Sequence, residues 1–344
     1  MANIKFSLYK LPNNAIIKVV GTMDTVSIVA LSFISTRSKS LIKSLNLKDV
    51  KFALGIPGFV TVSMESIECP SFFLEREDTY FATASPIRLE EIPIFINTMF
   101  IEMLGEDQIE TNVKWKNSGK LNYRQFFEHF QSIFHFDESL EISFFAGIQE
   151  IGEIEKLKEI LPKFTELQIG SESSDCTRKI MKEFLSAAKS LTTTLDVFYS
   201  QNRNPVSLQK CGIHNLDEIS IMNVKDLKLE DMLTLNARQI EFYVRREPHG
   251  SLGNRFIKSW IRGSNPRMDF IFIRFQYDPA FKADSILKGI QYKVVPENQE
   301  VYTVERYALP VKGGFEIRSR NGRRANVQIY SDDPFSEISI YVFV

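Results

Sequence analysis

Cysteine and histidine are the first residues to consider for chemistry, and this chain of 344 residues holds only three cysteines and four histidines. Cys211 and His214 have the spacing of half a zinc site, but no second Cys/His pair completes a tetrahedral set. His129 and His135 lie six residues apart among phenylalanines, off one helical face, and are expected to be partly buried. Cys176 lies in a polar segment without a neighbouring activating base. We therefore expect no catalytic residue, no metal site and no cofactor.

Arginines are the second group of candidates. Arg318, Arg320, Arg323 and Arg324 are close in sequence, and a looser set recurs earlier as Arg245, Arg246, Arg255, Arg262 and Arg267. The planar guanidinium group favours carboxylate and phosphate, so the first set could bind an acidic or phosphorylated segment of a substrate. It could also be a solvated face. The formal net charge of -1 and the lack of a regular set of accompanying aromatics speak against nucleic acid and anionic lipid as partners.

A short apolar pattern recurs from about residue 120 onward: apolar, two residues, apolar, one residue, apolar. Its clear copies are Phe164/Leu167/Ile169, Leu216/Ile219/Ile221, Ala237/Ile240/Phe242 and Met268/Ile271/Ile273. Weaker copies are Ser139/Ile142/Phe144 and Thr192/Leu195/Val197. The copies return at intervals of roughly 21 to 31 residues, which is typical of leucine-rich repeats. We expect each copy to be a strand, and most of the 28 phenylalanines to lie in the core.

Amphipathic segments between these copies predict helices. They span residues 123–134, 154–161, 178–188, 227–235 and 253–261. Alternation of strands and helices predicts parallel strands with helices on the outside. Because one such unit cannot bury its own apolar face, neighbours must stack, and the stack presents a surface suited to binding a protein. The pattern therefore predicts an irregular solenoid similar to leucine-rich repeats.

The segments on either side of the solenoid have other patterns. Near the C-terminus, Asn321-Gly322 predicts a hairpin between alternating strands, and residues 338–344 predict a last strand, so we expect an antiparallel cap. Between residues 50 and 115, the sequence predicts strands at 60–64, 72–74 and 80–82 and a helix at 91–104.

The first 45 residues predict three short helices. Leu11 and Pro12 open the first, Asp24 is a candidate cap for the second, and Ser35 is a candidate cap for the third. Apolar residues recur along the first two at helical spacing, among them Ile16, Val20, Met23, Ile28 and Leu31. A core this small is marginal alone and would gain stability by burying apolar surface on a partner.

The stretch from Leu11 to about Leu45 resembles an F-box, the module that docks on the Skp-type adaptor of cullin ubiquitin ligases. Asn14 stands where an acidic residue is common and Ser38 where a tryptophan is common, but residues 35–41 resemble the third helix of the large nematode group of F-box proteins, which usually lacks that tryptophan. The resemblance implies that the adaptor-binding residues are Leu11, Pro12, Ile16, Val20, Met23, Ile28 and Leu31.

A second resemblance covers Leu233 to Phe275. Its string from Trp260 through Gly263 and Asn265 to Arg267 is similar to the type 2 F-box-associated domain of the same nematode proteins. The two resemblances imply a substrate receptor of a Skp-cullin-F-box ligase, which binds the adaptor at one end and an unknown protein substrate at the other. Two alternatives stay open: a protein-binding scaffold without ligase association, and a hydrolase or transferase that uses Cys176 or Cys211.

The sequence thus predicts an α/β protein in four parts: an F-box (1–46), a connecting β/α segment (47–115), an F-box-associated region similar to leucine-rich repeats (116–300) and a C-terminal β-hairpin cap (301–344). The N-terminus lacks the unbroken apolar stretch of a signal peptide. The most apolar segment, Val26 to Ile34, is far shorter than the roughly 20 residues that span a bilayer. We expect a cytoplasmic or nuclear protein.

Overall fold

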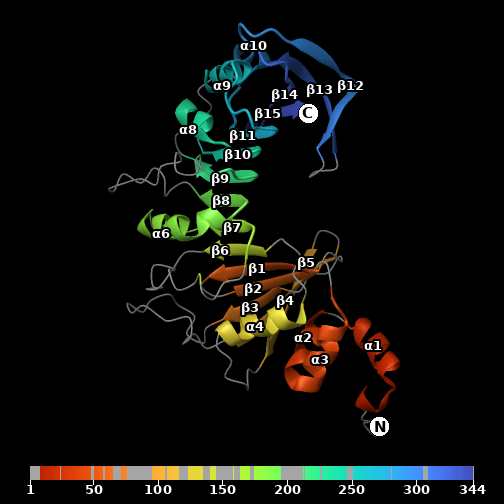
Figure 1. Cartoon of the computed structure of the whole chain (residues 1–344). Helices are drawn as coiled ribbons and strands as arrows, with labels where there is room; N and C mark the ends of the chain where they lie inside the picture. Colours follow the sequence, from red (N-terminus) through yellow and green to blue (C-terminus); the bar gives the residue numbers. More distant parts are fainter. Residues whose placement is uncertain are drawn as a thin grey trace. The chain divides into compact units, whose positions relative to one another are not determined.

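A computed structural model of the chain divides into two compact units, Met1–Phe164 and Thr165–Val344 (Figure 1). The structure describes residues 8–23, 25–47, 50–56, 59–64, 71–75, 95–104, 107–115, 123–134, 140–144, 158, 163–170, 174–194, 212, 214–224, 227–245, 251–279, 281–304 and 309–343. Within these ranges, no helix combines the length and the apolar character needed to cross a membrane.

The first unit begins with short helical elements. They are the 3-10 turn η1 (Leu8–Lys10) and the helices α1 (Asn13–Gly21), α2 (Thr25–Ile34) and α3 (Thr36–Ser44). Pro12 precedes α1 directly. The Ser35 hydroxyl caps α3 by accepting a hydrogen bond from the Ser38 backbone N–H at 3.1 Å. Three predicted helices and the Ser35 cap are confirmed, whereas the predicted cap Asp24 lies outside the described residues.

A mixed sheet and the helix α4 (Tyr123–Ile133) follow in the described part of the first unit. The strands of the sheet are β1 (Val50–Ile56), β2 (Phe59–Met64), β3 (Ser71–Glu75), β4 (Phe95–Leu104), β5 (Asp107–Trp115) and β6 (Leu140–Phe144), and α4 lies between β5 and β6 in the chain. The order across the sheet is β6-β1-β2-β3-β4-β5. Strands β1 and β6 are parallel, and the other neighbours are antiparallel.

The predicted helix at 91–104 is wrong, because Phe95–Leu104 forms strand β4. This strand pairs with β3 on one side and with β5 on the other. Five of its ten residues are β-branched or aromatic, namely Phe95, Ile96, Thr98, Phe100 and Ile101, and such residues favour strands once neighbouring strands are available. The predicted strands at 60–64 and 72–74 are confirmed, and 80–82 lies outside the described residues.

The second unit opens with parallel strands that follow one another in chain order. They are β7 (Glu166–Ile169), β8 (Ser190–Thr194), β9 (Glu218–Val224), β10 (Gln239–Val244) and β11 (Phe270–Gln276). Helical elements α6 (Ser174–Phe184), η4 (Leu185–Ala187), α8 (Leu229–Thr234) and α9 (Leu252–Ile261) connect them. The helices α6, α8 and α9 lie on one side of the strands (Figure 1). The predicted helix at 154–161 lies almost wholly outside the described residues.

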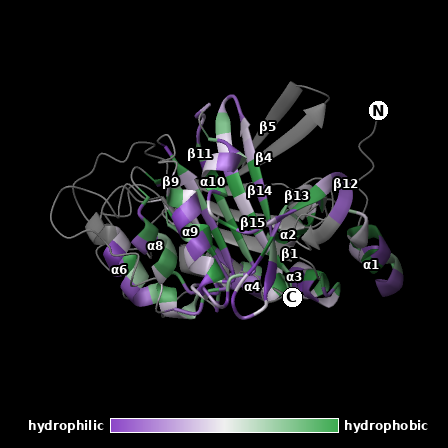
Figure 2. Ribbon diagram, turned by 90° about the horizontal axis from the view of Figure 1, so that it is seen from above, coloured by the Kyte–Doolittle hydropathy of each residue, from purple (hydrophilic) through white to green (hydrophobic). Residues whose placement is uncertain are grey.

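Two rows of buried side chains cross these five strands. One row is Leu167, Leu191, Ile219, Ile240 and Ile271, and the other is Ile169, Thr193, Ile221, Phe242 and Ile273; no member is more than 1% exposed. Helices α6 and α9 carry both hydrophobic and hydrophilic residues (Figure 2), as expected of helices that bury one side against a sheet. The four clear copies of the apolar pattern are therefore confirmed as the inner face. In the first unit, Ile142 and Phe144 of β6 are also buried.

The weak copy predicted at Thr192/Leu195/Val197 is out of register. Leu191 and Thr193 occupy the buried rows, whereas Thr192 points the other way and is half-buried. Because the buried position 193 holds the polar residue threonine, the apolar pattern does not identify the correct register of this repeat. Leu195 and Val197 lie outside the described residues.

Antiparallel strands complete the second unit. They are β12 (Lys293–Val304), β13 (Leu309–Arg318), β14 (Arg324–Asp332) and β15 (Phe335–Phe343), preceded by the short helix α10 (Ala283–Ile286). Strand β15 pairs with β11, and the sheet continues through β14 and β13 to β12. The predicted hairpin is confirmed: the Asn321-Gly322 turn joins β13 to β14, and Gly322 has a φ of 87°.

The string from Trp260 to Arg267 ends α9 in a defined way. The Gly263 N–H donates to the Trp260 carbonyl at 2.9 Å and the Ser264 N–H to the Ser259 carbonyl at 3.1 Å, which is the hydrogen-bond pattern of a Schellman motif. Gly263 has a φ of 108°, a conformation that side chains oppose. The buried Trp260 anchors the last turn of the helix.

Asn265 then ties the exit of α9 to the end of α8. Its side chain is buried, its φ is 49°, and its Nδ2 donates to the carbonyls of Met232 at 3.0 Å and Leu235 at 2.9 Å. The Asn265 amide thus donates to two carbonyls at the end of α8, where a helix lacks backbone N–H partners of its own. This accounts for an asparagine at this point of the string.

We expect Asn265→Ala to lower the free energy of unfolding by about 2 kcal/mol or more, because two buried carbonyls lose their donor and alanine disfavours a positive φ. Urea unfolding of the full chain measures the change. The control is Asn236→Ala, which removes one exposed hydrogen bond to Asn215 and should change stability by about 0.5 kcal/mol or less. Equal effects of the two substitutions would refute this role for Asn265.

Candidate functional site

The seven residues predicted to bind an adaptor divide into two groups in the structure. Ile16, Val20, Ile28 and Leu31 are buried among the N-terminal helices, whereas Leu11 and Met23 are half-buried and Pro12 is exposed. The buried four hold the helices together. They are out of reach of a partner unless the helices separate.

Other apolar side chains on the same helices face the solvent. Ile17 and Val19 on α1 are 40% and 39% exposed, and Ile34 at the end of α2 is 71% exposed. Among the residues of the first unit whose side-chain exposure the structure describes, which do not include those of β1 to β5, these three are the exposed large hydrophobic residues. Exposed apolar groups gathered on one small element indicate a surface for a partner. These three are not among the seven residues predicted to bind an adaptor, because the spacing of apolar residues does not tell which of them face a partner and which face the interior.

The third helix is covered by the N-terminal 3-10 turn. The Tyr9 hydroxyl is hydrogen-bonded to the hydroxyl of the buried Ser38, and the Arg37 guanidinium lies over the Tyr9 ring at 4.7 Å from its centroid. Ser38 also contacts the Ser35 hydroxyl at 2.8 Å. A small polar residue at position 38 therefore fits a site that the Tyr9 side chain closes.

Helix α4 packs against α2 through His129. Its ring stacks on Phe33 with 4.0 Å between ring centroids, and its Nε2 lies 2.8 Å from the Ser32 hydroxyl. Because the Ser32 hydroxyl donates to the Val29 carbonyl at 2.6 Å, its oxygen accepts the proton of Nε2. Burial, and secondarily the charge of Lys39, lowers the pKa of His129 to about 4, so the ring is neutral at neutral pH. The prediction that His129 is a packing residue is confirmed, while His135 lies outside the described residues.

An aromatic cluster formed by Tyr243, Phe272, Arg274 and Phe335 lies on the outer face of the second unit's sheet. The Arg274 guanidinium carbon is 5.6, 5.3 and 4.9 Å from the centroids of the three rings, and its Nε donates to Glu337 at 2.6 Å. These positions alternate with the buried rows, so they point away from the helices. Most phenylalanines are predicted to lie in the core, and Phe335, which is exposed, and Phe272, which is half-buried, are exceptions. Burial raises the pKa of the Tyr243 hydroxyl above its usual value.

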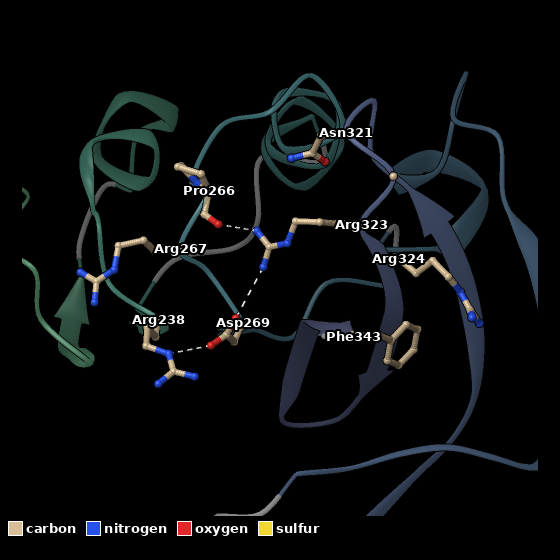
Figure 3. A pocket seen from close by; sticks show the side chains of 9 residues that line it. Arg238, Pro266, Arg267, Asp269, Asn321, Arg323, Arg324 and Phe343 are labelled. Carbon is tan, nitrogen blue, oxygen red and sulfur yellow. Dashed lines mark hydrogen bonds and ion pairs between the residues drawn. The ribbon is translucent and has the colours of Figure 1, made fainter.

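Arginines line an open pocket of about 760 Å³ where β10 and β11 begin and β13 turns into β14 (Figure 3). Its lining is Arg238, Pro266, Arg267, Asp269, Asn321, Gly322, Arg323, Arg324 and Phe343. Two of the four predicted substrate-binding arginines, Arg323 and Arg324, belong to it, together with two that lie far from them in the sequence. Only long-range strand pairing brings Arg238 and Arg267 to the same place, so no local sequence signal could have found the set.

The remaining two predicted arginines flank this pocket. Arg318 pairs with Arg324 across the hairpin, and Arg324 pairs with Phe343 on β15, so the three side chains share one face of the sheet. Arg320 is exposed in the turn and is fixed by its backbone N–H, which donates to the Ile261 carbonyl at 2.8 Å. The side chains of Arg318 and Arg320 have no partner among the described residues.

Of the residues considered for metal binding or catalysis, His129 and His214 have side chains that the structure describes. His214 is half-buried before β9, and Cys211 and the side chain of Cys176 lie outside what the structure describes. Among the described residues, no group of three or more histidine, cysteine, aspartate or glutamate side chains is arranged to hold a metal ion.

Two family models match the chain. Residues 8–49 match the F-box domain, and residues 207–273 match the model described as F-box associated. The chain carries an F-box domain and an F-box-associated domain. The F-box match covers η1 to α3, and the F-box-associated match covers β9, α8, β10, α9 and the start of β11. Both resemblances seen in the sequence are confirmed at this level. No curated protein and no solved structure matches the chain.

The F-box therefore has one side that packs against α4 and another that exposes apolar residues to solvent. Its interior combines apolar residues with the buried hydroxyls of Ser32 and Ser38, and its α2 side contacts α4 through a neutral histidine. Its exposed apolar residues lie on α1 and at the end of α2.

The contact with α4 should depend on pH. His129 has a pKa of about 4 in the folded chain against 6.5 for an ordinary histidine. Between these values the unfolded chain binds more protons, so stability rises with pH; the contribution is complete above about pH 6.5 and is lost as the pH falls towards about 4. Urea unfolding of the first unit between about pH 7 and about pH 5 measures this slope.

The substitution His129→Gln should reduce the slope, because glutamine keeps an N–H donor for Ser32 but does not titrate. The control is His214→Gln in the second unit, which should leave the slope of the first unit unchanged. An unaltered slope in the His129→Gln protein would contradict the role given to this ring.

Proposed function

We propose that this protein is the substrate receptor of a Skp-cullin-F-box ubiquitin ligase. F-box domains generally bind a Skp-type adaptor and, through it, a cullin, and an F-box joined to an F-box-associated domain fits a substrate receptor in general. The observation that carries the proposal is that three large apolar residues of the F-box helices, Ile17, Val19 and Ile34, are exposed to solvent. Within this view the chain is a member of the nematode group of F-box proteins.

The adaptor surface proposed is Pro12, Ile17, Val19 and Ile34, with the half-buried Leu11 and Met23 at its margin. Burying a large apolar side chain on a partner stabilises the complex by about 1.5–3 kcal/mol. Three such side chains supply a useful interface without any change in the F-box interior. Ile16, Val20, Ile28 and Leu31 contribute indirectly by holding the helices.

The C-terminal body is proposed to bind the protein substrate. Its parallel strands pair through Glu166, Ser190, Glu218, Gln239 and Phe270, which are 21 to 31 residues apart, and this spacing supports a degenerate solenoid similar to leucine-rich repeats. The aromatic cluster supports a protein ligand, because aromatic residues and arginine are enriched where binding energy concentrates. Nucleic acid and membranes are not part of this proposal.

A receptor supplies binding, and the thioester chemistry belongs to other subunits of a ligase. We accordingly propose that the chain is not an enzyme and needs no cofactor, and that it acts in the cytoplasm or nucleus, where such ligases work. A hydrolase or transferase using Cys176 or Cys211 would instead show labelling of a cysteine by an electrophilic probe.

The test of adaptor binding is the variant Ile17→Glu/Ile34→Glu. Both side chains are exposed, so the variant should fold, and adaptor affinity should fall by about a hundredfold or more, because each lost apolar contact is worth at least about one factor of ten. Co-expression of the full chain with a nematode Skp-type adaptor, followed by size-exclusion chromatography and titration calorimetry, measures the loss.

The matched control is Asn14→Glu/Ser40→Glu, which adds the same charge at two exposed positions and should still co-elute with the adaptor. Binding that survives Ile17→Glu/Ile34→Glu would refute the proposed surface. A folded wild-type chain that never co-elutes with the adaptor would refute the ligase role and favour a protein-binding scaffold.

A further inference from the structure

The arginine pocket of the second unit is built around Asp269. The Asp269 carboxylate accepts a hydrogen bond from Arg238 Nε at 2.7 Å, and Arg323 Nη2 approaches its other oxygen at 3.5 Å (Figure 3). The single negative charge of Asp269 thus interacts with two positively charged arginines of the pocket, Arg238 and Arg323. The arrangement leaves an excess of positive charge at a fixed place.

Arg323 has a structural part in this arrangement. Its guanidinium also donates to the carbonyls of Pro266 at 2.6 Å and Met268 at 2.7 Å, and its side chain is only 25% exposed. These bonds attach the β13–β14 turn to the segment that enters β11. Arg323 therefore shapes the pocket, and the charges available to a ligand are those of its neighbours.

Arg238 and Arg267 are the arginines placed to contact a ligand. The Arg238 side chain is 57% exposed although it is paired with Asp269. Arg267 donates to the Asn236 carbonyl at 3.0 Å, and its ion pair with the half-exposed Asp217 is 3.7 Å long, so water screens that attraction. A guanidinium group has five N–H donors, and an incoming anion can use those that point to solvent.

The charges around the pocket do not cancel. Four arginines and one aspartate line it. Arg318 and Arg320 flank the pocket, and the lining arginines form ion pairs with Asp269, Asp217 and Glu316. Arg324 is the best neutralised, because it makes two bonds of 3.0 Å to Glu316. On a chain with a net charge of -1, this local excess favours an anionic ligand.

We propose that this pocket binds an acidic or phosphorylated segment of a protein, with Arg238 and Arg267 contacting the anion and Arg323 positioning them. Phosphate and carboxylate share the chemistry required, since both accept paired hydrogen bonds from a guanidinium. A protein segment fits better than nucleic acid, because the one aromatic ring of the lining, Phe343, lies beneath the Arg324 guanidinium at 5.5 Å and is not presented for base stacking. Only the identification of that segment as a ligase substrate rests on the proposed function.

The test uses a fluorescein-labelled peptide of alanine and glycine that carries two phosphoserines, and the same peptide with two glutamates or two serines in their place. Fluorescence anisotropy with the full chain should give binding of the phosphorylated or the glutamate peptide, weakened by salt, and none of the serine peptide. Which anionic peptide binds more tightly identifies the source of the charge.

The variant Arg238→Gln/Arg267→Gln should weaken this binding by about a hundredfold, since two charge-assisted contacts are lost and each costs about a factor of ten. The control is Arg245→Gln/Arg255→Gln, which removes the same charge at two exposed positions outside the pocket and should bind normally. Arg238→Lys/Arg267→Lys keeps the charge and the fold but loses the planar fork, so we expect a smaller loss.

Each of the following results would overturn the proposal. They are equal binding of all three peptides, equal effects of the pocket and control variants, and tighter binding of a single-stranded oligonucleotide than of any peptide. Failure of all peptides to bind the folded chain would do the same. Adaptor co-elution is measured separately, so a failure of the pocket is distinguishable from a failure of the receptor role.

Discussion

The second unit depends on the register of its strands. Successive residues of a strand point to opposite faces, so the pairing that aligns Ile240 with Ile271 in a buried row also places Tyr243 and Arg274 together on the outer face. A slip of one residue in either strand would turn the core outward and separate the aromatic cluster. The strand register therefore determines both the packing of the core and the arrangement of side chains on the outer surface.

The same pairing gathers the arginine pocket. Parallel strands begin at one edge of a sheet, which brings Arg238, just before β10, beside Asp269, just before β11. Strand β15 runs the other way and ends at this edge, where the Val342 N–H donates to the Asp269 carbonyl at 2.8 Å. The hairpin turn then delivers Arg323. The pocket thus lies where the parallel strands, which end with β11, meet the antiparallel strands, which begin with β15.

What the sequence could predict follows from the range of the interactions. The Ser35 cap, the Asn321-Gly322 turn and the buried rows depend on neighbouring residues or on a simple period, and they were predicted. Strand β4 was mistaken for a helix because its partners decide its structure. Arg238 and Arg267 were not joined to the predicted hairpin arginines, since only tertiary pairing unites them. Family resemblance supplied the F-box and its associated domain, which periodicity alone left as ordinary helices and strands.

The F-box helices illustrate how a very small core can still leave a surface for a partner. Six apolar residues are buried in the interior, namely Ile16, Val20, Ile28, Val29, Leu31 and Ile42. The α2 side is closed by His129, whose neutral ring offers both a stacking face to Phe33 and a donor to Ser32. A positively charged ring at that place would lose solvation and would be repelled by the charge of Lys39, so burial and Lys39 both favour the neutral form. The α2 side of the F-box is thus packed against α4, whereas Ile17, Val19 and Ile34 are exposed. In the proposed complex, burial of these three side chains drives the binding of an adaptor.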